Sequence, residues 1–103
     1  MRFTMSQRGS VFCTPERAIR LLTELEQAEA GHRQDPELVL DFSNVTRVSP
    51  SFANGFVGAV IDKRRSFDLP DPELDGASAF VKKVIDRALS ERELQLHEIA
   101  LAS

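Results

Sequence analysis

Apolar residues at helical spacing predict the first long element of the chain, a helix over about residues 15–30. Its apolar face holds Ala18, Leu21, Leu22, Leu25 and Ala28, which lie three or four positions apart. Thr14 followed by Pro15 is typical of a helix start, because Thr caps the first turn and Pro has no hydrogen bond to lose there. Gly31 is the expected C-terminal cap.

A second apolar run, LVLDF at residues 38–42, shows little alternation and predicts a short strand covered on both faces. A second helix is expected from Ser49 or Ser51 to about Arg65. One side of this helix holds Phe52, Phe56, Ala59, Val60 and Lys63. Val57 lies beside that side, and a helix with apolar residues on more than one side is either deeply buried or in contact with a partner. The pattern leaves both alternatives open.

Shorter runs of apolar residues predict three further strands. Residues 2–6 and 10–13 predict two short strands around a tight turn at Gly9. Residues 67–69 predict a very short edge strand, because the nearby prolines argue against a regular central one. These strands and the one at 38–42 would together supply a small sheet.

The C-terminal part predicts one more helix, over residues 78–90, with Ser78 or Asp75 as its cap. After it, Leu94 and Leu96 alternate with polar residues, which favours a half-buried strand over a continued helix. The predicted order alternates strands with helices. It indicates one α/β domain over residues 1–103, with helices packed on a mixed β-sheet of about four strands.

Length and charge narrow the class of protein. The chain has 103 residues, the size of a single domain, and a net charge of -3 with acidic and basic residues interspersed. The absence of a basic stripe argues against a nucleic-acid partner. Cys13 is the only cysteine, and no apolar run approaches the roughly 18 residues that cross a bilayer. Since residues 1–8 also lack the apolar core of a secretory signal, we expect a cytoplasmic protein with no membrane partner.

Two hydroxyls flank a proline at Ser49-Pro50-Ser51, where the second helix is expected to start. The simplest interpretation is a helix cap, with Pro50 in the first turn. A phosphate on Ser51 is the functional alternative, because free N–H groups and the helix dipole favour negative charge there. A nucleophilic Ser51 is a weaker alternative, since no Gly-x-Ser-x-Gly surrounds it.

The other candidate residues carry less chemistry. Asp41 ends the predicted strand and either hydrogen-bonds the next turn or lies on the rim of a partner surface. His32, His97 and Cys13 are isolated and lack the spacing of a metal site, and phosphate-binding glycine loops are absent from the sequence. We therefore predict no metal, no cofactor and no catalytic residue.

The stretch VLDFSNVTRVSPSFANGFVGAV resembles the STAS domains, named for sulfate transporters and anti-sigma factor antagonists. It is more closely similar to a STAS-like branch of uncharacterised bacterial domains. The matching elements are Val39-Leu40-Asp41-Phe42, Val45, Ser49-Pro50-Ser51 and Phe52-Ala53. The resemblance implies a STAS-like fold and a non-enzymatic signalling domain. Such domains dock onto a kinase-like ATPase or an anti-sigma factor, and phosphorylation at the start of the helix ends the docking.

The chain departs from the family pattern at the phosphorylated position. Pro50 stands where the family places the phosphorylated Ser or Thr, so Ser51 and Ser49 are the phosphorylation candidates. Asn54 and Gly55 stand where the STAS-like branch often has an acidic pair. The partner-binding residues that the resemblance implies are Asp41, Ser49, Ser51, Asn54, Gly55, Val57 and Gly58.

Two functions follow as hypotheses. The first is a regulatory protein-binding domain that resembles an anti-sigma factor antagonist and docks through the helix after the 38–42 strand. The second is a small interaction protein that reuses the same fold for an unrelated target, without a phosphorylation switch. An enzyme or small-molecule sensor would need a catalytic constellation or a ligand pocket that the sequence does not indicate.

Overall fold

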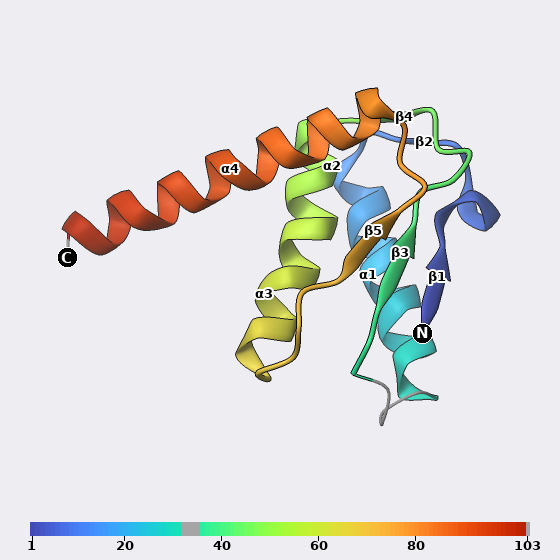
Figure 1. Cartoon of the computed structure of the whole chain (residues 1–103), viewed down its shortest axis with the longest axis horizontal. Helices are drawn as coiled ribbons and strands as arrows, with labels where there is room; N and C mark the ends of the chain where they lie inside the picture. Colours follow the sequence, from blue (N-terminus) through green and yellow to red (C-terminus); the bar gives the residue numbers. More distant parts are fainter. Residues whose placement is uncertain (32–35, 103) are drawn as a thin grey trace.

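The computed structural model describes the backbone of residues 1–31 and 36–102 and the side chains of residues 1–31 and 36–93. It is an α/β fold in which long helices pack against small groups of parallel strands (Figure 1). The core is built mainly from aliphatic and phenylalanine side chains of both kinds of element. An α/β class is therefore confirmed, although the strands are arranged differently from the prediction.

The larger sheet has three parallel strands, β1 (Arg2–Thr4), β3 (Val39–Asp41) and β5 (Glu73–Asp75), in the order β1-β3-β5. Phe3 and Leu40 lie in register and are buried on the face that the helices cover. On the other face Val39 lies between two exposed residues and is only partly buried. The expectation that this strand is covered on both faces is therefore wrong.

A second, separate pair of strands is formed by β2 (Val11–Phe12) and β4 (Arg47–Val48), which are also parallel. Both strands predicted before residue 14 are present as β1 and β2, but no tight turn joins them and each pairs with a different strand. A 3-10 helix, Met5–Arg8, separates them, and Met5 anchors it in the core. Over the described residues the strands thus form groups of three and two rather than one mixed sheet of about four.

Helix α1 spans Pro15–Ala30, as the apolar period predicts. The Thr14 hydroxyl accepts the Arg17 N–H at 3.2 Å, which confirms the predicted cap. Ala18, Leu21 and Leu25 are buried against the rest of the core. A strong local start signal and a regular period explain why this element was predictable.

The second helix is one rod over residues 50–66, made of α2 (Pro50–Ala53), a π-helical segment η2 (Asn54–Gly58) and α3 (Ala59–Ser66). Phe52 and Phe56 are fully buried, with ring centroids 5.6 Å apart. Val57 is also fully buried, so the apolar side chains on both sides of this stretch pack within the chain, while Ser51 and Asn54 stay exposed.

The C-terminal part differs most from the prediction. Residues 67–69 form no strand, since Phe67 is exposed and Asp68 has a φ of 56° that turns the chain. The third strand is β5 instead, and Ser78 then caps α4 (Ala79–Ala102) by accepting the Val81 N–H at 3.2 Å.

The predicted strand at residues 94–96 is also wrong, because the chain continues as helix there. Figure 1 shows the last turns of α4 running away from the rest of the fold. A helix satisfies its own backbone hydrogen bonds, whereas a strand in this position would need a neighbouring strand. None of the described helices combines the length and the apolar character that crossing a membrane requires.

Candidate functional site

The Ser49-Pro50-Ser51 turn lies beside the start of α1. Since β2 and β4 are parallel neighbours, their C-terminal ends meet at one edge, and each strand leads into a helix start. The Ser49 N–H donates to the Phe12 carbonyl at 3.1 Å, and the Ser49 hydroxyl donates to the Cys13 carbonyl at 3.1 Å. Ser49, the cap of the second helix, is thereby hydrogen-bonded to the residues that lead into α1.

The two serines of the turn have different roles. Ser49 Oγ also accepts the Phe52 N–H at 3.1 Å, so its proton and an acceptor position are both used. Ser51 Oγ lies 3.1 Å from Ser49 Oγ and is the donor of that pair, because the Ser49 proton already goes to Cys13. Ser51 is exposed. The helix-cap interpretation is therefore confirmed for Ser49, and Ser51 is left with the accessible hydroxyl.

Few backbone donors remain at this helix start. Pro50 has no N–H, the Phe52 N–H is held by Ser49 Oγ, and the Ala53 N–H donates to the Ser49 carbonyl at 3.0 Å. Only the Ser51 N–H of this first turn lacks a partner among the described residues. One free donor gives weak anion binding compared with the several donors of a phosphate loop.

Asp41 lies at the end of β3 and holds the following turn. Its Oδ1 accepts the Ser43 N–H at 2.9 Å, and its Oδ2 accepts from Arg2 Nε at 3.2 Å, while Arg2 also binds Asp75. Hydrogen bonds from Ser43, reinforced by the charge of Arg2, lower the pKa of Asp41 from its ordinary value. No contact recorded among the described residues joins Asp41 to Ser49 or Ser51, so the turn-forming interpretation of Asp41 is the one that its contacts favour.

Gly76, which follows β5, lies directly against the turn that Asp41 holds. Gly76 has a φ of 71°, and a Cβ built there would clash with Ser43 Oγ. The turn that Asp41 closes is therefore packed directly against the segment after β5. Both features mark a structural role for this corner of the sheet.

Two of the residues expected to bind a partner lie inside the fold. Val57 and Gly58 are buried, which leaves little of either for a partner to contact in this structure. Gly55 faces α1, where its Cβ position lies 3.4 Å from the Ala18 Cβ. Of the small residues in NGFVG, Asn54 alone is exposed, and its Oδ1 accepts from Arg92 Nη1 at 2.6 Å. The glycines admit neighbouring elements of the same chain instead of a partner.

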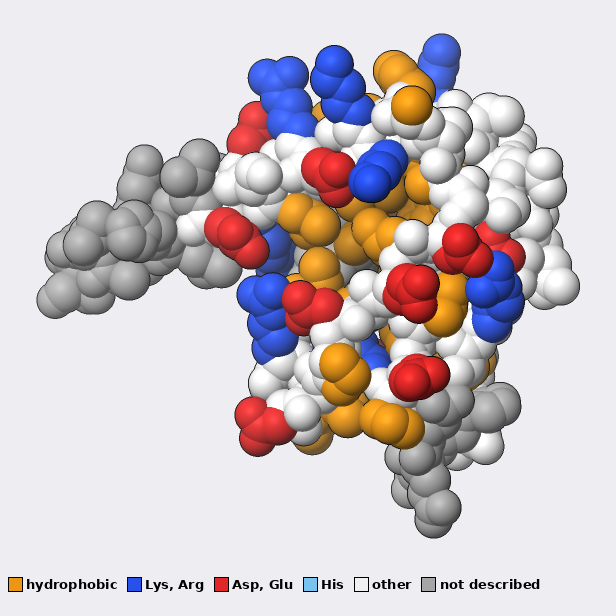
Figure 2. Space-filling view, viewed as in Figure 1, with side chains coloured by type: hydrophobic (Ala, Val, Ile, Leu, Met, Phe, Trp, Pro, Cys, Tyr) orange, Lys and Arg blue, Asp and Glu red, His pale blue; other side chains and the backbone are white. Residues whose placement is uncertain are grey.

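Arg92 is a residue that the sequence-based prediction missed. It occupies the space left free by Gly58 and also binds Asp62, so it joins α4 to the rod. Figure 2 shows one face of the molecule, with hydrophobic side chains near its centre and charged ones around them. The signal was present in the sequence, because Arg92 follows Val81, Ile85 and Ala88 at helical spacing on the buried side of α4.

The remaining candidates give no further site. His32 lies outside the described residues, as does the side chain of His97, and Cys13 is partly buried and unpaired. Within the described part of the chain, no group of His, Cys, Asp and Glu side chains could hold a metal ion. No neighbouring base for Ser51 is recorded there either.

Comparison with known protein families, with curated proteins and with solved structures finds no match to this chain in any of the three.

Proposed function

We propose that the protein is a non-enzymatic regulatory domain that binds another protein through the exposed start of the 50–66 rod. The observation that carries the proposal is the accessible Ser51 hydroxyl, held beside a Ser49 that is fixed as the cap. In this proposal the fold is STAS-like, as the sequence resemblance implies. The parallel order β1-β3-β5 with helices on one face is compatible with that. The partner is a kinase-like ATPase or an anti-sigma factor.

Phosphorylation of Ser51 is the proposed switch. The modification costs the fold one hydroxyl hydrogen bond, from Ser51 to Ser49, and leaves the cap intact. It adds roughly 1.5 to 2 negative charges beside the free Ser51 N–H at the positive end of the helix dipole. The added charge changes the docking surface while the core stays as it is, so the partner dissociates without unfolding the domain.

The second candidate function is an interaction domain without a switch. It is favoured by Pro50, which occupies the position that the resembling family phosphorylates, and by the full use of the Ser49 hydroxyl. Both functions use the same surface and neither includes turnover of a substrate. They differ only in whether Ser51 is modified.

A pull-down from the native host tests these functions, with mass spectrometry of the bound proteins and of residues 47–65. A kinase-like partner together with phosphate on Ser51 supports the first function. A single unrelated partner without phosphate supports the second. The absence of any partner contradicts both.

Charge substitution then tests the switch in isolation. We expect Ser51→Glu to weaken binding of the captured partner at least about tenfold, which is the size of a charge placed inside an interface. Ser90→Glu is the matched control, because Ser90 is exposed on α4 and receives the same charge away from the turn. Equal effects of the two substitutions would count against docking at Ser51.

A further inference from the structure

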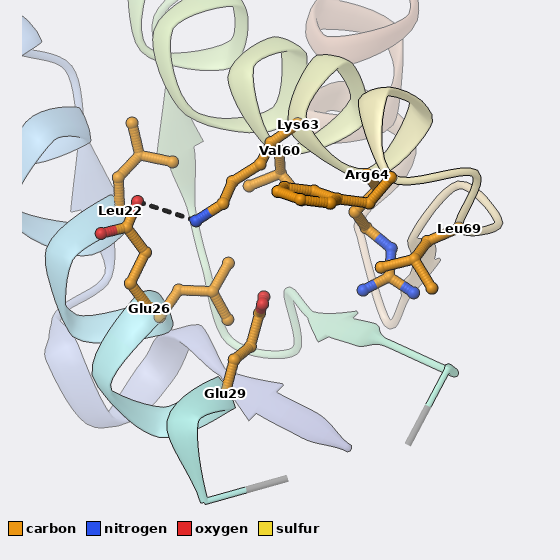
Figure 3. A pocket seen from close by; sticks show the side chains of 9 residues that line it. Leu22, Glu26, Glu29, Val60, Lys63, Arg64 and Leu69 are labelled. Carbon is orange, nitrogen blue, oxygen red and sulfur yellow. Dashed lines mark hydrogen bonds and ion pairs between the residues drawn. The ribbon is translucent and has the colours of Figure 1, made fainter. Parts of the chain in front are cut away.

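A cleft lies between the C-terminal half of α1 and the C-terminal half of the 50–66 rod, away from the helix start that holds Ser49 and Ser51 (Figure 3). Its volume is about 370 Å³, counted with its open mouth. The apolar side chains that line it are Leu22, Leu25, Val60, Phe67 and Leu69. Phe67 is 67% exposed, which is unusual for a side chain of this size and leaves the apolar wall accessible.

Three of the four charged side chains around the cleft are already satisfied within the fold. Lys63 Nζ donates to Glu26 at 3.0 Å. Arg64 is only 5% exposed, and its guanidinium donates to the carbonyl of Pro70 at 2.7 Å and to that of Pro36. The positive charges at this site are therefore committed to bonds that hold the helices and loops together.

Glu29 is the remaining charge. Its side chain is half-buried on α1, and it has no hydrogen bond or ion pair with any described residue. Figure 3 shows its carboxylate pointing into the cleft, on the side opposite Arg64. A carboxylate beside apolar walls loses part of its hydration, and a cation brought into the cleft would compensate for that loss.

We infer that this cleft binds a small amphipathic amine, whose apolar body packs between Leu22, Val60 and Phe67 and whose ammonium donates to Glu29. The cleft is open to solvent along an apolar wall, and the one uncommitted charge among the described residues that line it is negative. A carboxylate ligand would instead meet Glu29 with a like charge. This site is independent of the surface at Ser51.

NMR titration with three ligands of equal body and different head groups tests the inference, namely n-hexylammonium, hexanoate and 1-hexanol. We expect n-hexylammonium to shift the amides of residues 22–29 and 60–69, with a dissociation constant on the order of 1 mM. Hexanoate should bind at least about fivefold more weakly, since it lacks the ion pair.

Two variants and a control identify the contacts. Glu29→Gln should reduce n-hexylammonium binding about fivefold, to the level of 1-hexanol. Glu73→Gln removes the same charge from the open face of the sheet and should leave binding unchanged. Leu22→Ala should weaken all three ligands while keeping their order, because it shortens the apolar wall. Thermal unfolding of each variant shows that a loss of binding is not a loss of folding.

Three results would overturn the inference. Tighter binding of hexanoate would assign the head group to Arg64 instead of Glu29. Equal affinity for the three ligands would leave an apolar surface without recognition of a cation. Shifts confined to amides outside the cleft would place the binding elsewhere.

Discussion

The two ends of the helical layer satisfy their polar groups in different ways. At the N-terminal end, Thr14 and Ser49 cap the helices that they precede, through bonds to residues three positions ahead. At the C-terminal end, Arg64 reaches the carbonyl of Pro36, 28 positions away in the chain. The first end is organised by local sequence, whereas the second depends on the fold having formed.

This difference affects what each end can offer to a ligand or partner. The capped end has used most of its donors and presents little more than the Ser51 hydroxyl and N–H. At the other end, the buried Arg64 guanidinium bonds to the carbonyls of two loops, and Glu29 has no partner in the described part of the chain. The caps Thr14 and Ser49 therefore use most polar groups at their end of the helices, whereas the long-range bonds of Arg64 leave an open cleft next to them.

The largest expected effect on stability comes from Arg64, whose bonds to the Pro36 and Pro70 carbonyls we call the clamp. Arg64→Ala removes the buried guanidinium and leaves two backbone carbonyls without their donor, which should lower the free energy of unfolding by about 2–3 kcal/mol. Arg65→Ala is the matched control. Arg65 is exposed and pairs with Asp71, so its loss should cost less than about 1 kcal/mol. Urea denaturation of both variants measures the difference, and similar losses would show that Arg64 does not act as a clamp.

A smaller effect is expected at the caps. Ser49→Ala should lower the free energy of unfolding by about 1–2 kcal/mol, because the Phe52 N–H and the Cys13 carbonyl both lose their side-chain partner. Ser51→Ala removes the same atom two residues later, where only a serine–serine contact is lost, and should change stability by less than about 0.5 kcal/mol. If the two substitutions cost the same, the separation of a structural Ser49 from an accessible Ser51 is wrong.

The elements that could be predicted are those whose signals are local. Helix α1 has its cap, its period and its closing glycine within one stretch, and its bounds agree with the prediction. Strand β5 was missed because Leu74 is its one apolar residue and its hydrogen bonds come from β3, more than 30 positions earlier. The pattern at 67–69 looked more strand-like but lacks a neighbouring strand.

In the candidate site, too, the features with local signals were predictable and those that depend on tertiary contacts were not. The cap at Ser49 follows from residue type and position, and the contacts bear it out. Gly55 and Gly58 are among the partner-binding residues that the resemblance implied, yet the side chains that approach them, Ala18 and Arg92, belong to other helices of the same chain. Sequence spacing shows that a position is small, whereas only the tertiary structure shows what lies against it.

The smallest expected effect concerns the exposed ion pair next to the clamp. Hydrogen bonding from Arg65, with the attraction of its charge, lowers the pKa of Asp71 from the ordinary aspartate value. A lowered pKa means that this pair contributes stability above the pKa of the unfolded chain and loses it as the pH falls through the folded pKa. NMR titration of the Asp71 carboxyl should show the pKa rising toward its ordinary value in Arg65→Ala.

Arg64→Ala provides the contrast for that titration. The charge of Arg64 acts on Asp71 only as the weakest of its pKa determinants, so this substitution should move the Asp71 pKa less than Arg65→Ala does, although it costs far more stability. The two adjacent arginines would then contribute to stability in two different ways. Arg64 holds the fold through the backbone carbonyls of Pro36 and Pro70, which do not titrate, whereas Arg65 acts through the exposed Asp71 carboxylate, which acid protonates. A larger Asp71 shift in Arg64→Ala would mean that the clamp and the ion pair form one coupled unit.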